Sequence, residues 1–528
     1  MLIGETTLTA LSPTYVWIWT LFAIVLTWTA FHNGKKKGHN ATETETETES
    51  ETANRNGADV IVVGAGVAGS ALAYVLAKDG RKVHVIERDL SEPERMMGEV
   101  MQPGGRLMLA GLGLEDCLED IDAQKMKAFV VHKDGKYGNC PFPEDVKFPY
   151  EARARGFRNG RFVQRLRHKA SSHTNVNLEE GTVKSLVEEK GVIKGVKYKS
   201  KSTGQETTAF APLTVVCDGA YSNLRRSLHN PKVELHSYII GYTVKNSRLE
   251  DPENLHLIFS EPSFAVVYQI GSNEVRCMTE VLRENVPSIS SGEVISFLKE
   301  IIAPQVPPKL RDIFVKGLDE SPEIKTVATK SMGDSLCDKN GVIVLGDAFN
   351  MRHPIVASGM MVALSDIVIL RDLLKTLNNL GDAKKLSRAL KSFHKLRKPM
   401  SATVNTLADA FHQALIASSD KAREAMRQGS FNYLSRGGVF TKGLTAILGG
   451  MNPRPPSLVL HLFGITFASI ATLLSPFPTP HGIWHSLRLL RLALAMLGSH
   501  LKEEGVTQML SPAAAAAYRK RYMTATPA

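Results

Sequence analysis

Three glycines near the start of the chain have the residue type and spacing to bind a phosphate group. They lie in the run GAGVAG, residues 64–69, which follows an apolar stretch and precedes an alanine- and leucine-rich pattern extending to about Lys78. Gly64 would make a tight turn, Gly66 would let backbone amides approach a pyrophosphate, and Gly69 would let the helix pack closely on the strand. Because strand, turn and helix occur in this order, the pattern predicts a dinucleotide-binding βαβ unit.

An acidic residue at the end of the next strand indicates which dinucleotide is bound. The apolar residues 83–86 end at Glu87, whose carboxylate would accept hydrogen bonds from the ribose hydroxyls of an adenosine. An NADP site would carry a basic residue in place of this acid. Glu87, followed by Arg88, therefore favours FAD.

Two more acidic residues follow apolar strands much later in the chain. LTVVCDGA places Asp218 and Gly219 after one strand, and residues 222–225 can cap a following helix. GVIVLGDA places Asp347 after another, and a helix is expected to start near Gly359. In a two-domain flavoprotein such an aspartate can hydrogen-bond the ribityl chain or pyrophosphate linker of FAD. The positive end of the helix dipole would face the flavin ring, where negative charge builds on reduction.

The elements between these motifs differ from those of a pure nicotinamide dehydrogenase. Residues 181–200 contain two alternating strands that turn near Lys190 and Gly191, and a further strand pair ends at Asp218. Residues 236–281 alternate as several sheet strands do, and Phe259 and residues 264–268 are candidates for the apolar lining of a substrate cavity. The sequence thus predicts an α/β fold with a Rossmann-type FAD domain, an inserted antiparallel meander and a mixed-sheet substrate domain.

This combination resembles the flavoprotein monooxygenases of the para-hydroxybenzoate hydroxylase type. The similarity becomes specific in GEVMQPGG (98–105), RNGRFVQRLR (158–167) and GDAFNMRHP (346–354). These stretches resemble the squalene monooxygenase (squalene epoxidase) family, and its plant-type members in particular, over about residues 59–512.

The resemblance implies an enzyme of sterol or triterpenoid biosynthesis that epoxidises squalene to 2,3-oxidosqualene through a flavin hydroperoxide in an apolar pocket. It implies FAD, O2, and electrons from NADPH delivered by a separate membrane reductase. It also implies attachment to the endoplasmic reticulum membrane with the catalytic body facing the cytosol. Gln102 would lie near the flavin and the substrate channel, and Arg352 and His353 would fix a loop near the flavin edge by donating hydrogen bonds. By matching positions, FAD contacts fall on Val67, Ala68, Glu87, Arg88, Arg95, Arg167, Val183, Asp347 and Met360.

The residues present agree with this chemistry. Transfer of oxygen to an unactivated alkene needs a dry cavity that protects the reactive species, and it needs no nucleophile, metal or strong base. The sequence offers no convincing Ser/His/Asp set and no His/Cys metal cluster, so no metal is expected.

The chain departs from the family pattern at two places. After MRHP the family usually continues LTGGGM, whereas this chain has Ala357 and Ser358 in place of two glycines. A left-handed backbone at either position would cost about 1–2 kcal/mol. The family also has Gly-Tyr a few residues after DAQK, whereas this chain has Ala128 and Phe129, so a phenol is missing.

Composition and the two ends indicate a membrane-associated protein. A net charge of +11 without zinc spacing or an aromatic-interleaved basic stripe favours attraction to a membrane surface over nucleic acid. The five cysteines contain no CxxC and are expected to be reduced. An apolar segment at 13–32 is followed by three lysines, which predicts a transmembrane anchor, with a cleaved signal peptide as the alternative. Near the other end, 458–474 and 483–501 predict a helical hairpin dipping into one leaflet, with a buried helix pair as the alternative.

These patterns divide the chain into nine segments: an N-terminal segment (1–12), the anchor (13–32), a disordered linker (33–57), the first part of the FAD domain (58–232), substrate-domain strands (233–335), the second part of the FAD domain (336–375), a helical region (376–455), the membrane hairpin (456–512) and a tail (513–528). Two alternatives to squalene epoxidation are weighed: a diverged flavoprotein monooxygenase acting on another long isoprenoid lipid, and a catalytically silent flavin-binding membrane protein.

Overall fold

The computed structural model describes residues 57–144, 151, 153–229, 231–288, 292–320, 323–335, 337, 339–452 and 454–504. The chain separates into two units, Met1–Arg55 and Asn56–Ala528, and only the second is described here. The predicted N-terminal segment, the anchor, the linker up to residue 56 and the tail at 513–528 lie outside the described residues.

The first sheet of this unit has seven strands and carries the predicted glycine-rich turn. Its parallel part consists of strands that are buried or nearly so, and an antiparallel meander extends one edge through β8, β9 and β10. The two predicted strands at 181–200 are confirmed, with the turn at Lys190 and Gly191. In spatial order the strands are β10 (Glu206–Phe210), β9 (Val192–Ser200), β8 (Val176–Glu189), β2 (Val83–Glu87), β1 (Val60–Val63), β11 (Leu213–Val216) and β17 (Val342–Val344).

Helices from distant parts of the chain pack around this sheet. The alanine- and leucine-rich helix α2 (Val67–Lys78) begins where the predicted turn ends, and it packs against α4 (Asn159–Ser171) and α8 (Gly359–Lys375). The helix α3 (Pro103–Leu112) starts with a proline, which suits the first turn of a helix, and ends at Gly113 in a left-handed conformation. The predicted start of a helix near Gly359 is confirmed by α8.

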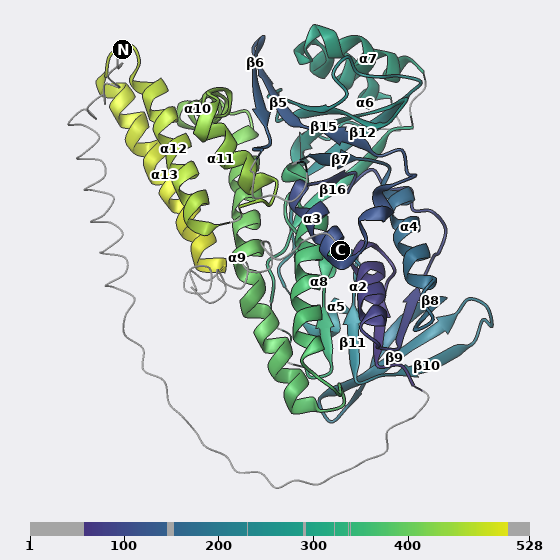
Figure 1. Ribbon diagram of the computed structural model, residues 1–528. Coiled ribbons are helices and arrows are strands. Elements are labelled where there is room, and N and C mark those ends of the chain that lie inside the picture. Colours follow the sequence, from purple (N-terminus) through teal and green to yellow (C-terminus); the bar gives the residue numbers. More distant parts are fainter. Residues whose placement is uncertain are drawn as a thin grey trace, which may run out of the picture. The chain divides into compact units, whose positions relative to one another are not determined.

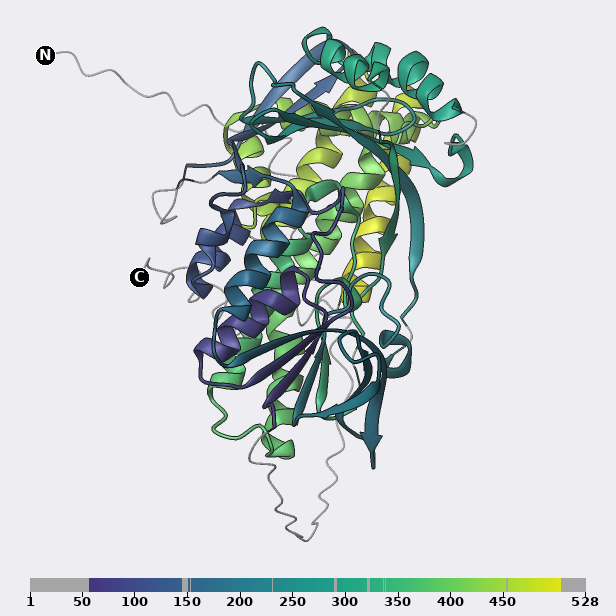
Figure 2. The ribbon, with the colours of Figure 1, turned by 90° about the vertical axis from the view of Figure 1, so that its right-hand side faces the viewer.

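The second sheet also has seven strands and is antiparallel except where β13 pairs with β5. Both of its faces are covered, since side chains of β14 alternate between two cores and α7 (Pro308–Asp319) packs on β12. This sheet, with α6 (Glu293–Ser296) and α7, lies at the opposite end of the unit from the first sheet (Figures 1 and 2). In order its strands are β16 (Lys325–Ser331), β12 (Glu234–Lys245), β15 (Glu274–Leu282), β14 (Ala265–Gly271), β13 (Asn254–Ile258), β5 (Ala128–Lys133) and β6 (Lys136–Pro141).

The second sheet differs from the predicted segment 233–335 in one respect. Its strands β5 and β6 come from residues 128–141, inside the segment expected to form the FAD domain. A small third sheet, β3 (Val100–Met101), β7 (Ala154–Gly156) and β4 (Gln124–Met126), joins the chain on both sides of this excursion. The chain therefore crosses between the two sheets four times rather than twice, because β5 pairs in parallel with a strand more than 100 residues later.

The remaining helices come after the last strand in the sequence, and they pack together as a separate layer. The helix α9 (Ala383–Leu415) packs along α8, and four further helices follow it: α10 (Lys421–Ser435), α11 (Gly438–Leu448), α12 (Pro455–Leu474) and α13 (Pro480–Glu504). A side chain at Gly429 of α10 would lie 2.1 Å from Ser469 Oγ of α12, so the absence of one permits this close packing. The two predicted C-terminal helices are confirmed, and both pack on α10 (Figure 1).

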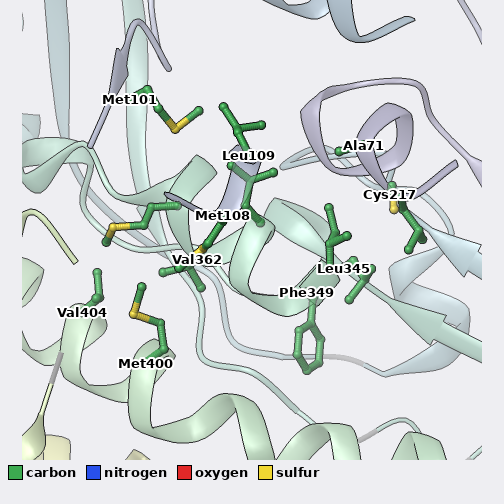
Figure 3. Close-up of a cluster of buried hydrophobic side chains, with 14 of the residues drawn as sticks. Ala71, Met101, Met108, Leu109, Cys217, Leu345, Phe349, Val362, Met400 and Val404 are labelled. Carbon is green, nitrogen blue, oxygen red and sulfur yellow. The ribbon is translucent and has the colours of Figure 1, made fainter. Parts of the chain in front are cut away.

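One large apolar cluster joins the first sheet to these helices. Figure 3 shows Met108 of α3, Val362 of α8 and Met400 of α9 in this cluster, together with Leu345 and Phe349 from the segment after β17. Each fully buried side chain of this size stabilises the fold by about 1.5–3 kcal/mol. The cluster therefore fixes α8 relative to the strand ends that precede it.

A buried ion pair also fixes α8 to α9, and its loss gives the first prediction. Arg397 of α9 is 1% exposed and donates two hydrogen bonds to Asp366 of α8, at 3.0 and 2.9 Å, and another to Asp334. Arg397→Met should destabilise the protein by about 3–5 kcal/mol, because the buried carboxylate of Asp366 loses both of these hydrogen bonds and Asp334, which also accepts from Lys398, loses one of its cationic partners. Thermal unfolding of the full chain in detergent measures this. Lys385→Met, at an exposed pair with Asp382, is the control and should change stability by less than about 0.5 kcal/mol. Equal melting temperatures for the two variants would contradict the prediction.

Candidate active site

The turn between β1 and α2 has the geometry that its glycines predicted. Gly64 has φ +96°, and a Cβ there would lie 2.6 Å from the carbonyl oxygen of Cys217. A Cβ at Gly69 would lie 1.9 Å from the carbonyl oxygen of Gly64, so the helix rests directly on the turn. Gly66, in contrast, has no atom within 4 Å of the position a Cβ would take. This open side is where a pyrophosphate would approach the backbone amides at the start of α2.

Glu87 lies at the end of β2 and braces the glycine turn. Its carboxylate accepts hydrogen bonds from the amides of Ala65, at 2.6 Å, and Asp89, at 3.2 Å. The buried guanidinium of Arg167 lies 3.7 Å from the same carboxylate and donates to the carbonyl of Ala65 at 2.8 Å. Arg167 of α4 also donates to the Ser91 carbonyl at 2.9 Å. These two predicted contact residues therefore hold the turn and the loop after β2 in place.

The second acidic residue is brought against the first turn by the pairing of β11 with β1. Asp218 follows β11, and one of its carboxylate oxygens, Oδ1, is buried with no hydrogen-bond partner among the described residues. Burial raises the pKa of Asp218, and the hydrogen bond from Ser222 offsets this only in part. Ser222 also accepts a hydrogen bond from the Arg225 amide at the start of the short helix α5 (Arg225–Leu228), as the capping pattern predicted. An unpaired buried carboxylate oxygen calls for a donor from a ligand.

The third acidic residue lies beside the same turn, because β17 pairs in parallel with β11. Gly346 has φ +64°, and a Cβ there would be 3.4 Å from the side chain of Ala68 at the start of α2. Asp347 is exposed, and a Cβ at Gly359, the first residue of α8, would lie 4.0 Å from its Oδ1. Three strand ends and two helix N-termini thus meet at one edge of the first sheet, where open α/β sheets bind their ligands.

For the other residues predicted to contact FAD, no hydrogen bond among the described residues indicates a role in binding. Val67, Ala68 and Met360 are half-buried at the starts of α2 and α8, Val183 is half-buried in β8, and Arg88 and Arg95 are exposed in the loop after β2. Their contacts with FAD stay predictions.

Gln102 lies at the start of α3 and contacts the segment that precedes α8. It is fully buried, and its amide donates to the carbonyl of Val356 at 3.0 Å, whereas its own side-chain oxygen, Oε1, has no partner among the described residues. The hydroxyl of Ser358 is likewise buried and unpaired among the described residues. Ala357, between these two contacts, has φ +47° and ψ +40°, a left-handed conformation. Of the two departures from glycine, one therefore strains the backbone and the other buries a polar group.

Arg352 and His353 fix the loop after β17, as predicted. Arg352 donates to the side-chain oxygen of Asn405 in α9 at 2.6 Å and also to Asn350. His353 is fully buried, and its Nε2 lies 2.8 Å from Glu280 of β15. Their position relative to the flavin edge stays a prediction.

Two buried carboxylates of the site region were missed by sequence reasoning. Glu99, in the GEVMQPGG stretch, accepts two hydrogen bonds from Arg276 of β15, at 2.8 and 2.7 Å, and Glu280 lies on the same strand. Burial raises the pKa of Glu99 against the opposing effect of Arg276. The available signal was Arg276 and Glu280, four residues apart in a strand whose other residues are mostly apolar, since that spacing places both on one face.

The alternation of side chains along β14 reduces the set of residues that can form the predicted apolar lining. Phe264, Val266 and Tyr268 belong to the large core that includes α3 and α8, whereas Ala265 and Val267 face α6 and α7. Phe259 packs edge-on against Phe431 of α10, with ring centroids 5.8 Å apart. Only alternate residues of 264–268 can therefore line a cavity on the side of the first sheet.

An apolar cavity lies between α9 and the four helices that follow. Its lining includes Leu407, Phe411, Leu444, Leu462 and Met496. Of the described helices, only α12 is long and apolar enough to cross a membrane. Arg488 of α13 pairs with Asp420, the residue before α10, at 2.6 Å.

The residues at the sheet edge fit an extended dinucleotide such as FAD. The space beside Gly66 would admit a pyrophosphate, and Asp218 offers an unpaired buried oxygen. Asp347 and the N-terminus of α8 lie side by side, so the helix dipole and the carboxylate would meet the same part of a ligand. The sheet edge thus combines phosphate, ribose and ring-side groups in one continuous row.

Comparisons with known proteins agree with this site. The family model for squalene epoxidase matches residues 210–484, and the model for FAD-dependent oxidoreductases matches residues 59–94. Squalene epoxidase 4 of Arabidopsis thaliana is 64% identical over 517 residues, covering 97% of this chain and 99% of that protein. Squalene monooxygenase 1,1 of Brassica napus is 63% identical over 515 residues, covering 97% and 98%.

Solved structures with a similar fold are flavin-dependent enzymes. The flavin-dependent brominase Bmp2 matches with a TM-score of 0.62 at 15% identity, covering 78% of this chain and 98% of the brominase. PqsL of Pseudomonas aeruginosa, a probable FAD-dependent monooxygenase, matches with a TM-score of 0.56 at 20% identity, covering 68% and 97%. At these identities the likeness establishes the fold, and it confirms the predicted α/β flavoprotein architecture.

The strained residue before α8 gives the second prediction. Ala357→Gly removes a left-handed penalty of about 1–2 kcal/mol, against about 0.5–1 kcal/mol of extra entropy in the unfolded chain. The net stabilisation should therefore lie between about 0 and 1.5 kcal/mol, measured as a higher melting temperature of the full chain in detergent. The control Ala363→Gly, inside α8, should lower stability by about 1 kcal/mol. Destabilisation of both variants by a similar amount would show that position 357 is not strained.

Proposed function

The chain belongs to the squalene epoxidase family, and we propose that it is an FAD-dependent monooxygenase that converts squalene to 2,3-oxidosqualene. The observation that carries this proposal is the 64% identity to a squalene epoxidase over 97% of the chain. The converging strand ends at Gly66, Asp218 and Asp347 supply a cofactor site in agreement with it.

Each part of the sheet edge has a role in holding the cofactor. The amides at the start of α2 would bind the pyrophosphate, Glu87 would meet the adenosine ribose, and Asp347 would accept a hydrogen bond from the ribityl chain or its linker. When bound and reduced by the proposed NADPH-dependent reductase, FAD would supply the two electrons that activate O2. The N-terminus of α8 would stabilise negative charge on the ring.

The protein's own contribution to oxygen transfer is a dry, ordered cavity. Buried apolar side chains of β14, α3 and α8 exclude water on the side of the second sheet that faces the cofactor edge. Gln102, the residue before α3, is fully buried and its side-chain oxygen has no partner among the described residues, so it would orient a group at the border between cofactor and substrate. We assign it this orienting role rather than a proton-transfer role, because an amide does not titrate.

We further propose that the substrate enters from a membrane. Squalene is a hydrocarbon with almost no solubility in water, and the apolar cavity between α9 and α13 adjoins the candidate membrane helix α12. Exposed apolar side chains on this hairpin, including Leu460, Phe467 and Trp484, have the chemistry to contact lipid. The endoplasmic reticulum membrane, with the catalytic body in the cytosol, is the proposed location, and an NADPH-dependent membrane reductase is the proposed electron donor.

A second candidate substrate is favoured by a specific observation. The buried hydroxyl of Ser358 has no hydrogen-bond partner in the part of the chain that the structure describes, and Phe129 packs edge-on against Phe142 where the family pattern has a tyrosine. These changes would suit a long isoprenoid lipid that carries a polar group able to pair with Ser358. Unbiased lipid profiling of cells that overexpress the protein distinguishes the two: a new oxygenated lipid with unchanged squalene supports the second substrate.

The third prediction tests the activity and the cofactor site together. The full chain, expressed in a cell that lacks its own squalene epoxidase, should restore 2,3-oxidosqualene, measured by mass spectrometry of extracted lipids. Asp347→Ala should weaken FAD binding about tenfold or more, because a hydrogen bond to a charged group is worth about 1.5–3 kcal/mol.

The control for this variant is Asp319→Ala, which removes an exposed carboxylate paired with Lys299 and should leave FAD binding unchanged. Absence of product from a correctly inserted, FAD-loaded protein would reject squalene as the substrate. A catalytically silent protein would in addition leave the lipid profile unchanged.

A further inference from the structure

A cluster of buried titratable groups outside the cofactor edge surrounds Glu280, in the middle of the second sheet. Its carboxylate is fully buried and accepts hydrogen bonds from the hydroxyls of Ser237 and Ser263. It also meets Nε2 of His353 at 2.8 Å and Nε2 of His412 at 3.0 Å. Ser237 lies in β12 and Ser263 just before β14, whereas His353 lies in the loop after β17 and His412 in α9. The side chain of Glu280 therefore joins four separate segments of the chain.

The hydrogen-bond pattern assigns the proton in the His353–Glu280 pair. The Ile355 amide donates to Nδ1 of His353 at 3.4 Å, so Nδ1 is the acceptor and Nε2 carries the hydrogen that is donated to Glu280. Burial lowers the pKa of His353 to about 4, which agrees with a neutral ring at neutral pH. Burial alone would raise the pKa of Glu280, but the hydrogen bond from His353 and the close approach of His412 outweigh it and lower that pKa.

Glu280, His353 and His412 have the composition of a metal site, but their geometry opposes one. The two imidazole rings are stacked, with centroids 3.8 Å apart and planes 10° apart. A metal bound by both Nε2 atoms must lie near both ring planes at about 2.0–2.1 Å from each nitrogen. Two nearly parallel planes cannot both contain it. The assigned tautomer also places a hydrogen, rather than a lone pair, on Nε2 of His353.

The cluster is better placed to hold the loop that leads into α8. His353 is the residue before the short turn η6 (Pro354–Val356), which ends at the left-handed Ala357. From the other side, Gln102 donates to the carbonyl of Val356. Residues 353–356 are thus fixed at both ends by buried hydrogen bonds, and Ala357, immediately before the N-terminal turn of α8, has little freedom to relax.

We propose that His353 and Glu280 are positioning residues, which hold Ala357 in its left-handed conformation and thereby set the start of α8 against the FAD site. The proposal rests on the proposed cofactor site. A strained conformation persists only where surrounding contacts impose it. The His353–Glu280 hydrogen bond is one such contact, and it ties this loop to the sheet that forms the substrate side.

The test combines loss of the contact with relief of the strain. His353→Phe keeps a ring of similar size and removes the hydrogen bond to Glu280. Titration of the full-length H353F apoprotein with FAD, followed by flavin fluorescence, should show FAD binding about tenfold weaker than in the wild type. Ala357→Gly in the same chain should restore FAD affinity to within about threefold, because glycine adopts this conformation without the clamp.

The matched control is His394→Phe: His394 is a half-buried histidine that contacts the rings of Phe349 and Phe393 rather than Glu280. Any loss of affinity in H394F should not be recovered by A357G. Equal recovery in both backgrounds would mean that glycine only adds general stability, and it would overturn the proposal. So would unchanged FAD affinity in H353F, or failure of A357G to restore it.

A conservative variant keeps the test decisive if H353F does not fold. His353→Gln retains a donor at similar reach, and it should bind FAD within about threefold of the wild type with an unchanged flavin absorbance spectrum. A folded H353Q protein with about tenfold weaker FAD binding would overturn the proposal. So would a stoichiometric transition metal in the purified wild-type protein that is lost in the variants. Because these measurements use FAD without squalene, they are independent of whether 2,3-oxidosqualene is the product.

Discussion

The close approach of α2 to the turn after β1 is the contact on which the rest of the site depends. Gly69 lies so near the carbonyl of Gly64 that any side chain there would clash with it. This contact directs the N-terminus of α2 at the edge where β11 and β17 also end. Gly346 can then lie against Ala68, which places the segment after β17 beside the first turn. A bulkier residue at position 69 would move α2 away from the strand ends that carry Asp218 and Asp347, and it would thereby separate the groups of the cofactor site.

Buried charged groups then align the two sheets and the long helices. Arg276 and Glu280 lie on one face of β15 and contact Glu99 and His353, respectively, from the cofactor side. Arg397 of α9 likewise joins this helix to α8 by donating hydrogen bonds to Asp366. Such pairs contribute little net stability compared with apolar residues of equal volume, but breaking one is costly. Their effect is to make one relative arrangement of the segments much better than its neighbours, which an apolar core alone does less sharply.

The sequence revealed the local parts of the site and not their connections. The turn at 64–69, the acid at Glu87 and the strand-end acids Asp218 and Asp347 were predicted because each depends on residues within about ten positions. Glu280 and His412 were missed because the partners of Glu280 lie 17 to 132 residues away, and nothing in a single sequence pairs them. The joining of β5 to the second sheet was missed for the same reason, since parallel pairing leaves no local signal.

Ala357 depends both on the local sequence pattern and on contacts with distant residues. The resemblance indicated that a glycine position had been filled, but whether this would matter depended on the backbone conformation, which is left-handed at Ala357 and ordinary at Ser358. A cost of about 1–2 kcal/mol at Ala357 is comparable to the net contribution of one buried hydrogen bond, about 0.5–3 kcal/mol, and two such bonds hold the segment before it. The loop can therefore carry a non-glycine residue as long as His353 and Gln102 keep their partners. In this chain the tolerance for a changed residue beside the cofactor site is set by a carboxylate on another sheet.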